Sequence, residues 1–177
     1  MNTAARDGEV MPVGEAREQI LTMVERVAMV HYHFATAIIR ELGEEKGRRL
    51  IADAIDGYGR EVGERHRDKV IAAGLAPNCE NYRAVPDLAR LAWSPESMPR
   101  MEINGQERPV CPLAKYWIEK GAREVGRLYC GVDQAKYRAF DPECECRHLQ
   151  NVLDGDDGCQ VVANKRSEWE KIDGGAL

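Results

Sequence analysis

The sequence lacks any long run of hydrophobic residues, and this absence limits the classes to which the protein can belong. No stretch of about 18 apolar residues occurs among its 177 residues, which excludes a membrane-spanning helix. The N-terminus also lacks a basic segment followed by an apolar one, so no secretory signal is expected. These two absences predict a cytoplasmic protein without a membrane partner.

Clusters of positive charge are missing as well. The net charge is −5, and the 25 Lys and Arg residues are scattered among 30 Asp and Glu residues. A nucleic-acid surface needs clustered positive charge to displace counterions from phosphates, so no nucleic-acid partner is expected. With 44% hydrophobic residues and no internal repeat, the chain predicts one packed domain at 15–172, between a flexible N-terminus at 1–14 and a flexible tail at 173–177.

Two long helices are expected in the first half of the chain. Apolar residues recur at helical spacing over Glu15–Leu42, and Gly43 is suited to end that helix. A second helix is expected over Glu44–Ala73. It contains three glycines, each of which costs about 1 kcal/mol relative to alanine in a helix interior: Gly57, Gly59 and Gly63. Close packing against the first helix is the preferred explanation, and a kink or an approaching ligand is the alternative.

The second half alternates helices and hairpins. Residues 76–99 are expected to be irregular, apart from a short helix at Asp87–Trp93, and Asn104-Gly105 predicts a hairpin. The remaining elements are expected to be helices at 112–119 and 123–140 and strands at 147–153 and 159–163. This order predicts an α+β fold, with two long N-terminal helices and two further helices packed on a small antiparallel sheet.

Six cysteines require an explanation: Cys79, Cys111, Cys130, Cys144, Cys146 and Cys159. Disulfides would require an oxidising compartment, so without an export signal we expect reduced thiols that fill the core, bind a metal or act as nucleophiles. Four of the six lie in the last 50 residues. This asymmetry points to the C-terminal part of the chain as the functional region.

A metal site is not firmly predicted. In a strand, Cys144, Cys146 and His148 would alternate onto one face about 7 Å apart, which is too wide for one metal. In a loop the three could converge on zinc, although the spacing differs from the C-x₂-C pairs of structural zinc sites. The acidic loop at 154–158 does not follow the ligand pattern of an EF-hand.

Helical spacing suggests two groups of candidate site residues. Asp133 and Gln134 follow Cys130 by three and four residues, so all three would share one face of a helix. A carboxylate there could act as a base for the thiol, and a buried structural cysteine is the alternative. His31 lies on the apolar stripe of the first helix, where it could face a site or be a hydrogen-bonded core residue.

Three segments of the chain resemble the L-2-amino-thiazoline-4-carboxylate hydrolase family: Cys111–Trp117, Tyr129–Tyr137 and Asn151–Cys159. The family's C-terminal pattern is a cysteine followed three residues later by Asp, then a hairpin with Gly-Asp and a second cysteine. Here these residues are Cys130, Asp133, Gly155, Asp156 and Cys159. The helical first half is also similar in layout, so the resemblance covers most of the chain. Cys144 and Cys146 are not part of the pattern.

The resemblance implies hydrolytic opening of a small cyclic substrate, such as 2-aminothiazoline-4-carboxylate, to an N-carbamoyl cysteine. Either a cysteine attacks the ring carbon, or an Asp activates water. The candidate catalytic residues are Cys130, Asp133, Asp156, Cys159 and His148. The candidate substrate-binding residues are Tyr129, Gln134, Lys136 and His31.

Two other functions remain open from the residues alone. One is a non-catalytic sensor of a small ligand or metal, and the other is a structural zinc or redox-cysteine protein using Cys144, Cys146, His148 and Cys159. The expected partner is a small-molecule substrate, and a homo-oligomer remains open. No cofactor is firmly predicted, and zinc is the metal that such a cysteine–histidine site would hold. The functional centre is placed between Tyr129 and Cys159.

Overall fold

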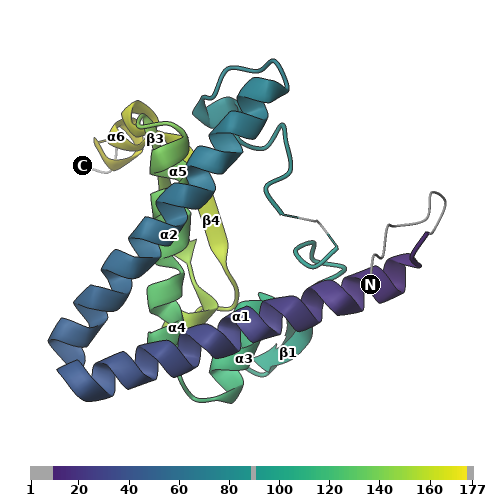
Figure 1. The fold of residues 1–177 in the computed structure, drawn as a ribbon, viewed down its shortest axis with the longest axis vertical. Helices are drawn as coiled ribbons and strands as arrows, with labels where there is room; N and C mark the ends of the chain where they lie inside the picture. The colour runs from purple at the N-terminus through teal and green to yellow at the C-terminus, as the bar shows by residue number, and fades with distance from the viewer. Residues whose placement is uncertain (1–9, 89–90, 175–177) are drawn as a thin grey trace, which may run out of the picture.

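Two long helices that meet at a sharp corner dominate the protein (Figure 1). The structure is a computed structural model, which describes residues 10–88 and 91–174. Helix α1 (Val13–Leu42) ends at Gly43, and α2 (Glu44–Ala72) begins directly after it. Gly43 has φ +78°, a left-handed conformation that glycine adopts without steric cost. Both helices and the corner between them confirm the prediction.

Three shorter helices follow: α3 (Pro112–Glu119), α4 (Arg123–Tyr129) and α5 (Gly131–Phe140). A single helix was predicted over 123–140, and the structure divides it at Cys130, which caps both α4 and α5. The Cys130 N–H donates to the Arg127 carbonyl and the Asp133 N–H to the Cys130 carbonyl, so the chain tightens here. Cys130 therefore lies at the N-terminus of a helix and not in the middle of one.

The glycines of α2 allow close contact with α5. A Cβ at Gly59 would lie 2.5 Å from the Cβ of Ala135, and one at Gly63 would lie 2.2 Å from the carbonyl oxygen of Lys136. A Cβ at Gly57, in contrast, would meet only the end of the Arg60 side chain, at an ordinary contact distance of 3.9 Å. The predicted reason, close packing, is confirmed for Gly59 and Gly63, but the predicted neighbour, α1, was wrong because these two residues contact α5.

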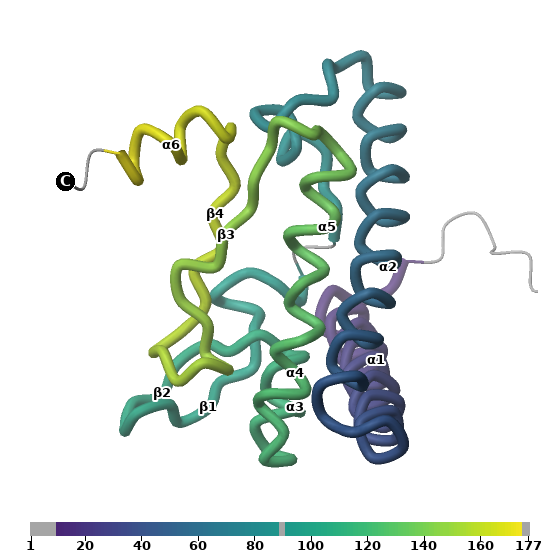
Figure 2. The backbone as a smooth tube through the Cα atoms, turned by 90° about the vertical axis from the view of Figure 1, so that its left-hand side faces the viewer, coloured from purple at the N-terminus to yellow at the C-terminus, as the bar shows by residue number. Residues whose placement is uncertain are grey.

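The strands form two separate antiparallel hairpins (Figure 2). In the first, β1 (Arg100–Ile103) pairs with β2 (Gln106–Pro109) across the predicted Asn104-Gly105 turn, where both residues have positive φ. In the second, β3 (Cys144–Gln150) pairs with β4 (Gln160–Lys165). Strand β3 begins three residues before the predicted strand, and Val152–Asp154 form a 3₁₀ turn, η2. The α+β class is confirmed, with two small sheets in place of one.

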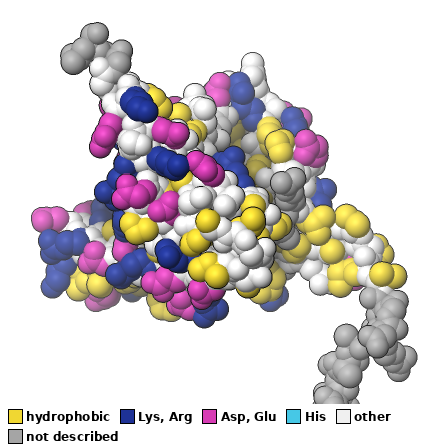
Figure 3. All heavy atoms as spheres, turned by 90° about the horizontal axis from the view of Figure 1, so that it is seen from above, with side chains coloured by type: hydrophobic (Ala, Val, Ile, Leu, Met, Phe, Trp, Pro, Cys, Tyr) yellow, Lys and Arg dark blue, Asp and Glu magenta, His cyan; other side chains and the backbone are white. Residues whose placement is uncertain are grey.

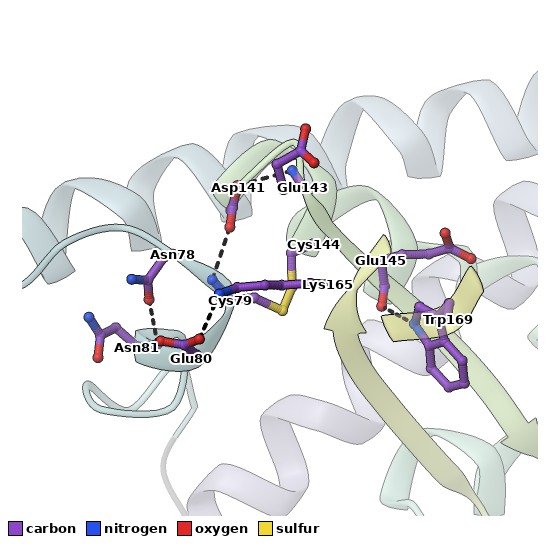
Figure 4. The surroundings of a disulfide bond; sticks show 10 residues. All are labelled: Asn78, Cys79, Glu80, Asn81, Asp141, Glu143, Cys144, Glu145, Lys165 and Trp169. Atoms are coloured by element: carbon purple, nitrogen blue, oxygen red, sulfur yellow. Dashed lines mark hydrogen bonds and ion pairs between the residues drawn. A yellow bond between two sulfur atoms is a disulfide. The ribbon is translucent and has the colours of Figure 1, made fainter. Parts of the chain in front are cut away.

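A disulfide joins Cys79 to Cys144 (Figure 4). Cys79 lies in a 3₁₀ turn, η1 (Cys79–Asn81), and Cys144 begins β3, so the bond joins the segment after α2 to the second hairpin. The Cys79 N–H also donates to the carboxylate of Asp141 at 3.0 Å. The expectation of reduced thiols was therefore wrong for these two residues. Cys111, Cys130, Cys146 and Cys159 are free.

The chain ends in a helix that the sequence did not predict, α6 (Arg166–Gly174). Its Trp169 is buried and donates its indole N–H to the Glu145 carbonyl at 3.0 Å. The helix includes the first two residues of the predicted tail, and 175–177 lie outside the described residues, as do 1–9. The predicted helix at Asp87–Trp93 falls partly on residues 89–90, which are also outside the description, and the residues around them form bends and turns.

The buried apolar side chains form two groups. The first core combines α1, α3, the first hairpin and η2: Ala28, Ile103, Val110, Ala114, Tyr116, Trp117, Val152 and Leu153. The second core combines α2, α5, β3 and the segment after α2: Val70, Tyr82, Tyr137, Phe140, Cys144 and Cys146. No helix in the described part of the chain has the length and hydropathy needed to cross a bilayer.

Candidate active site

A cleft of about 1080 Å³ opens between α1, α2, α5, the second hairpin and the segment at 82–98. One end is polar and is lined by Arg83, Asp87, Asp133, Lys136, His148 and Asn151. Three free cysteines border the same end: Cys111, Cys130 and Cys159. Four of the five residues predicted to be catalytic therefore line this cleft: Cys130, Asp133, His148 and Cys159. The fifth, Asp156, does not line it.

Asp133 and His148 form a hydrogen-bonded pair at the polar end. The His148 ring donates from Nε2 to Oδ2 of Asp133 at 2.9 Å, and the His148 side chain is only 3% exposed. Burial alone would raise the pKa of the Asp133 carboxyl, but the bond from His148 and the Lys136 ammonium outweigh it and hold the pKa below its ordinary value. Asp133 is therefore ionised at neutral pH. As the acceptor of this hydrogen bond, it favours the His148 tautomer that carries its proton on Nε2.

Lys136 lies one helical turn after Asp133 and is held between two carboxylates. Its Nζ lies 3.0 Å from Oδ1 of Asp133 and 3.2 Å from Oδ2 of Asp87, which also accepts a hydrogen bond from Tyr82 at 3.1 Å. Burial lowers the pKa of Lys136, but the carboxylates prevail and raise it above its ordinary value. The ammonium is thus charged, and its charge is already balanced by the protein.

Asn151, which the sequence analysis did not single out, connects the histidine with the thiols. It is 2% exposed, and its Nδ2 lies 3.4 Å from Nδ1 of His148. Its Oδ1 accepts from the Leu153 N–H at 2.9 Å and lies 4.0 Å from Sγ of Cys159. A buried polar side chain requires several partners, and neither the burial of Asn151 nor its partners could be predicted from the sequence.

The cleft thiols are protonated at neutral pH. Burial raises the pKa of Cys130 to about 12, although a hydrogen bond with Asn151 lowers it in part. Burial likewise raises the pKa of Cys111 to about 11. The Cys130 Sγ lies 3.9 Å from the Gly126 carbonyl oxygen, to which it donates, and the thiol makes no cap hydrogen bond with the start of α5. Any nucleophilic role for these thiols therefore requires a base within the cleft.

The other predicted residues have different surroundings. The Asp156 carboxylate accepts from the Asn151 N–H at 2.7 Å and so fixes the turn that carries the asparagine. Tyr129 lines the cleft and is hydrogen-bonded to Tyr58. Gln134 does not line the cleft, and its buried Oε1 has no partner in the described part of the chain.

His31 lies behind the cleft and not in its lining. Its Nε2 donates to the Val125 carbonyl at 2.9 Å, and its ring contacts Trp117 and Tyr129 edge-on. Burial lowers the pKa of His31, so the neutral ring is favoured. The structure gives His31 the geometry of a core residue that supports Tyr129.

The cysteine–histidine set considered for zinc is not available. Cys144 is bonded to Cys79, and Cys146 is buried in the second core. Within residues 10–88 and 91–174, no three His, Cys, Asp or Glu side chains are grouped so that they could hold a metal ion. The set of Cys144, Cys146 and His148, named for the case that a metal is bound, is therefore not formed, because the disulfide uses the first ligand.

Arg83 is a second cleft residue that the sequence analysis missed. It lines the polar end and hydrogen-bonds Tyr137. Unlike Lys136, it forms no ion pair with any described residue. Its position in an irregular segment gave no sequence signal.

A comparison with models of known families gives a match over most of the chain. A family model described as L-2-amino-thiazoline-4-carboxylic acid hydrolase matches residues 22–162, a range that includes every residue of the polar end. No curated protein and no solved structure matches the chain significantly. The matched range covers most of the 177 residues, and the chain therefore belongs to the L-2-amino-thiazoline-4-carboxylic acid hydrolase family.

Proposed function

We propose that the protein hydrolyses a 2-aminothiazoline ring that carries a carboxylate and releases an N-carbamoyl cysteine. Membership of a family named for this reaction supports the proposal. The observation that carries it is the connected series Asp133, His148 and Asn151, which ends beside the thiols of Cys130 and Cys159 in one cleft. A thiol activated by an imidazole that a carboxylate orients is a set of groups that can open such a ring by nucleophilic attack.

In the proposed mechanism Cys130 is the nucleophile. Its Sγ forms a bond to C2 of the ring, the bond between C2 and the ring sulfur breaks, and the thiol proton passes to the departing sulfur. Water then adds to C2 and the bond from C2 to Sγ breaks. One proton of the water returns to Cys130, the other goes to the ring nitrogen, and the oxygen remains on C2 as the carbonyl of the product.

His148 moves these protons, and its neighbours position it. Because Nε2 donates to Asp133, Nδ1 is the ring nitrogen that can accept a proton, and it lies 3.4 Å from Nδ2 of Asn151. The ionised Asp133 stabilises the imidazolium that forms when Nδ1 is protonated. Asn151 orients the ring and the thiol, and Asp156 holds Asn151 in place.

The substrate carboxylate pairs with Arg83 in this proposal. Arg83 lines the polar end and has no carboxylate partner among the described residues, whereas Lys136 already contacts two. A guanidinium also binds a carboxylate through two parallel hydrogen bonds, which fixes the orientation of the ring. Lys136, assigned to the substrate from sequence, acts instead by keeping Asp133 ionised.

Replacement of single cysteines tests the assignment. Cys130→Ala should lower kcat/KM for 2-aminothiazoline-4-carboxylate by about 10³-fold or more, because the covalent route is lost. Cys111→Ala and Cys159→Ala change the same cleft and should stay within about tenfold of the parent. Acid-quenched enzyme should carry the mass of the opened substrate on Cys130. Full activity of Cys130→Ala without such an adduct would reject the covalent route.

The raised thiol pKa supports a second mechanism for the same reaction. Because the Cys130 thiol is protonated and Asp133 is ionised, the pair Asp133–His148 could instead take a proton from water that adds directly to C2. In that case Asp133→Asn would abolish turnover, while Cys130→Ala would retain it. The two variants measured side by side separate the mechanisms.

A further inference from the structure

The cleft continues beyond its polar end along one side of α1. The lining there is apolar and comes from α1, the segment before β1, and α3: Ile20, Met23, Val24, Val27, Met98 and Leu113. Figure 3 shows hydrophobic side chains gathered where the N-terminal part of α1 projects from the rest of the molecule. We call these six residues the apolar arm of the cleft.

The cleft is larger than the family substrate requires. Drug-sized ligands occupy clefts of about 300–1,000 Å³, and this cleft of about 1080 Å³ lies just above that range. A single five-membered ring with a carboxylate and an amino group needs only the polar end, where Arg83, Asp133 and His148 are found. The apolar arm would then hold only water against hydrophobic side chains, which is unfavourable.

We propose that the substrate of this protein is a 2-aminothiazoline carboxylate that bears an apolar substituent, and that the apolar arm binds this substituent. The inference rests on the proposed function, because the polar end must hold the reacting ring. It commits to a small-molecule occupant because the arm and the polar end are parts of one continuous cleft. Tyr129 and Cys111 line the cleft beside both parts, so a substituent leaving the ring on the side away from C2 enters the arm directly.

The strength of the effect follows from apolar burial. Each buried methylene contributes about fourfold in binding, since its transfer from water is worth about 0.8 kcal/mol. Partial burial of a butyl group on ring carbon C5 should therefore raise kcat/KM by about tenfold to 100-fold over the unsubstituted ring. Polar substituents of the same length should give no gain.

Two valines on α1 provide a matched pair of variants. Val27 lines the arm and is 43% exposed, whereas Val30 is 55% exposed and lies outside the cleft. Because both are exposed, Val27→Asp and Val30→Asp should both fold. In Val27→Asp the advantage of the butyl-substituted ring over the unsubstituted ring should fall to about twofold or less, and Val30→Asp should keep the parent's ratio.

The experiment measures turnover and calorimetric binding of the unsubstituted, 5-methyl and 5-butyl rings with the parent and both variants. Equal kcat/KM for all three rings overturns the apolar arm and leaves the proposed hydrolysis standing. Tighter binding of the butyl ring without turnover, lost in Val27→Asp, supports the arm and rejects the hydrolysis. A parent that sediments as a dimer, with both variants monomeric, assigns the face of α1 to a second copy of the chain and overturns the inference.

Discussion

The two hydrophobic cores contribute different chemistry to the cleft. Tyr129 and the thiols of Cys111 and Cys130 pack against the first core. Asp133 and His148 lie on α5 and β3, and these elements place Tyr137, Phe140, Cys144 and Cys146 in the second core. The proposed nucleophile therefore packs on the first core and the proposed acid–base pair on the second, although Cys130 caps the helix that carries Asp133. Their alignment depends on how the two cores are held relative to each other.

The cores are also stabilised in different ways. In the first, the Trp117 indole N–H donates to the Ala28 carbonyl at 3.0 Å, so α3 is joined to α1 by packing and one buried hydrogen bond. The second contains a covalent link and a stacked ring pair, Tyr82 and Tyr137, with centroids 3.9 Å apart. Of these two cores, only the one that carries the acid–base pair therefore depends on a redox-sensitive bond.

Loss of the disulfide should have the largest effect on stability. The bond joins residues that are 65 positions apart in the sequence. By restricting the unfolded chain, a loop of this length stabilises the folded protein by about 4 kcal/mol at most. Reduction of the parent should therefore lower the free energy of unfolding in urea by about 2–4 kcal/mol. It should also reduce turnover, because α5 and β3 lose their covalent anchor to η1.

The double variant Cys79→Ser and Cys144→Ser is the control for that experiment. It should be as unstable as the reduced parent and insensitive to reductant. If the parent unfolds at the same urea concentration with and without dithiothreitol, the second core does not depend on the bond, and the contrast between the cores disappears.

The crossing of α2 and α5 should give the next largest effect. In Gly63→Ala the new Cβ would meet the Lys136 carbonyl oxygen at 2.2 Å, so the helices must separate, at a cost of about 2–3 kcal/mol. The same change at Gly57 meets only the flexible end of Arg60 at 3.9 Å and should stabilise α2 by about 0.5–1 kcal/mol. Urea unfolding of the two variants measures this difference, and equal stabilities would show that α5 tolerates displacement.

Much of the fold could be predicted because its signals are local. Apolar spacing predicts α1 and α2, and Asn104-Gly105 predicts the first hairpin, since backbone conformation there depends on neighbouring residues. The break at Cys130 and the start of β3 could not be found in this way. Both follow from tertiary contacts, with α5 closely packed on α2 and Cys144 bonded to Cys79.

The candidate site was predictable in its residue types and not in its connections. The motif suggested Cys130 and Asp133, and helical spacing made their proximity plausible. The bond between Asp133 and His148 joins residues 15 apart, and the contacts of Lys136 with Asp87 span 49 residues, so no local pattern contains them. Asn151 and Arg83 were missed for the same reason, because burial and ion pairing are properties of the folded chain.

Titration of the buried Cys146 thiol should give the smallest effect, and it tests whether the second core excludes water. Burial raises the pKa of Cys146, in the second core, to about 12. A raised pKa contributes stability that is complete below the unfolded value of about 8.5 and is lost as pH rises toward the folded value. Between about pH 8 and 9, below the titration of tyrosine, ionisation of the unfolded Cys146 should lower the free energy of unfolding by about 0.7 kcal/mol. Cys146→Ala should lose less stability over this range than the parent, while Cys159→Ala, which removes an exposed thiol, should follow the parent more closely. Parallel pH dependence for parent and Cys146→Ala would show that the second core admits water around its thiol, as the open cleft does.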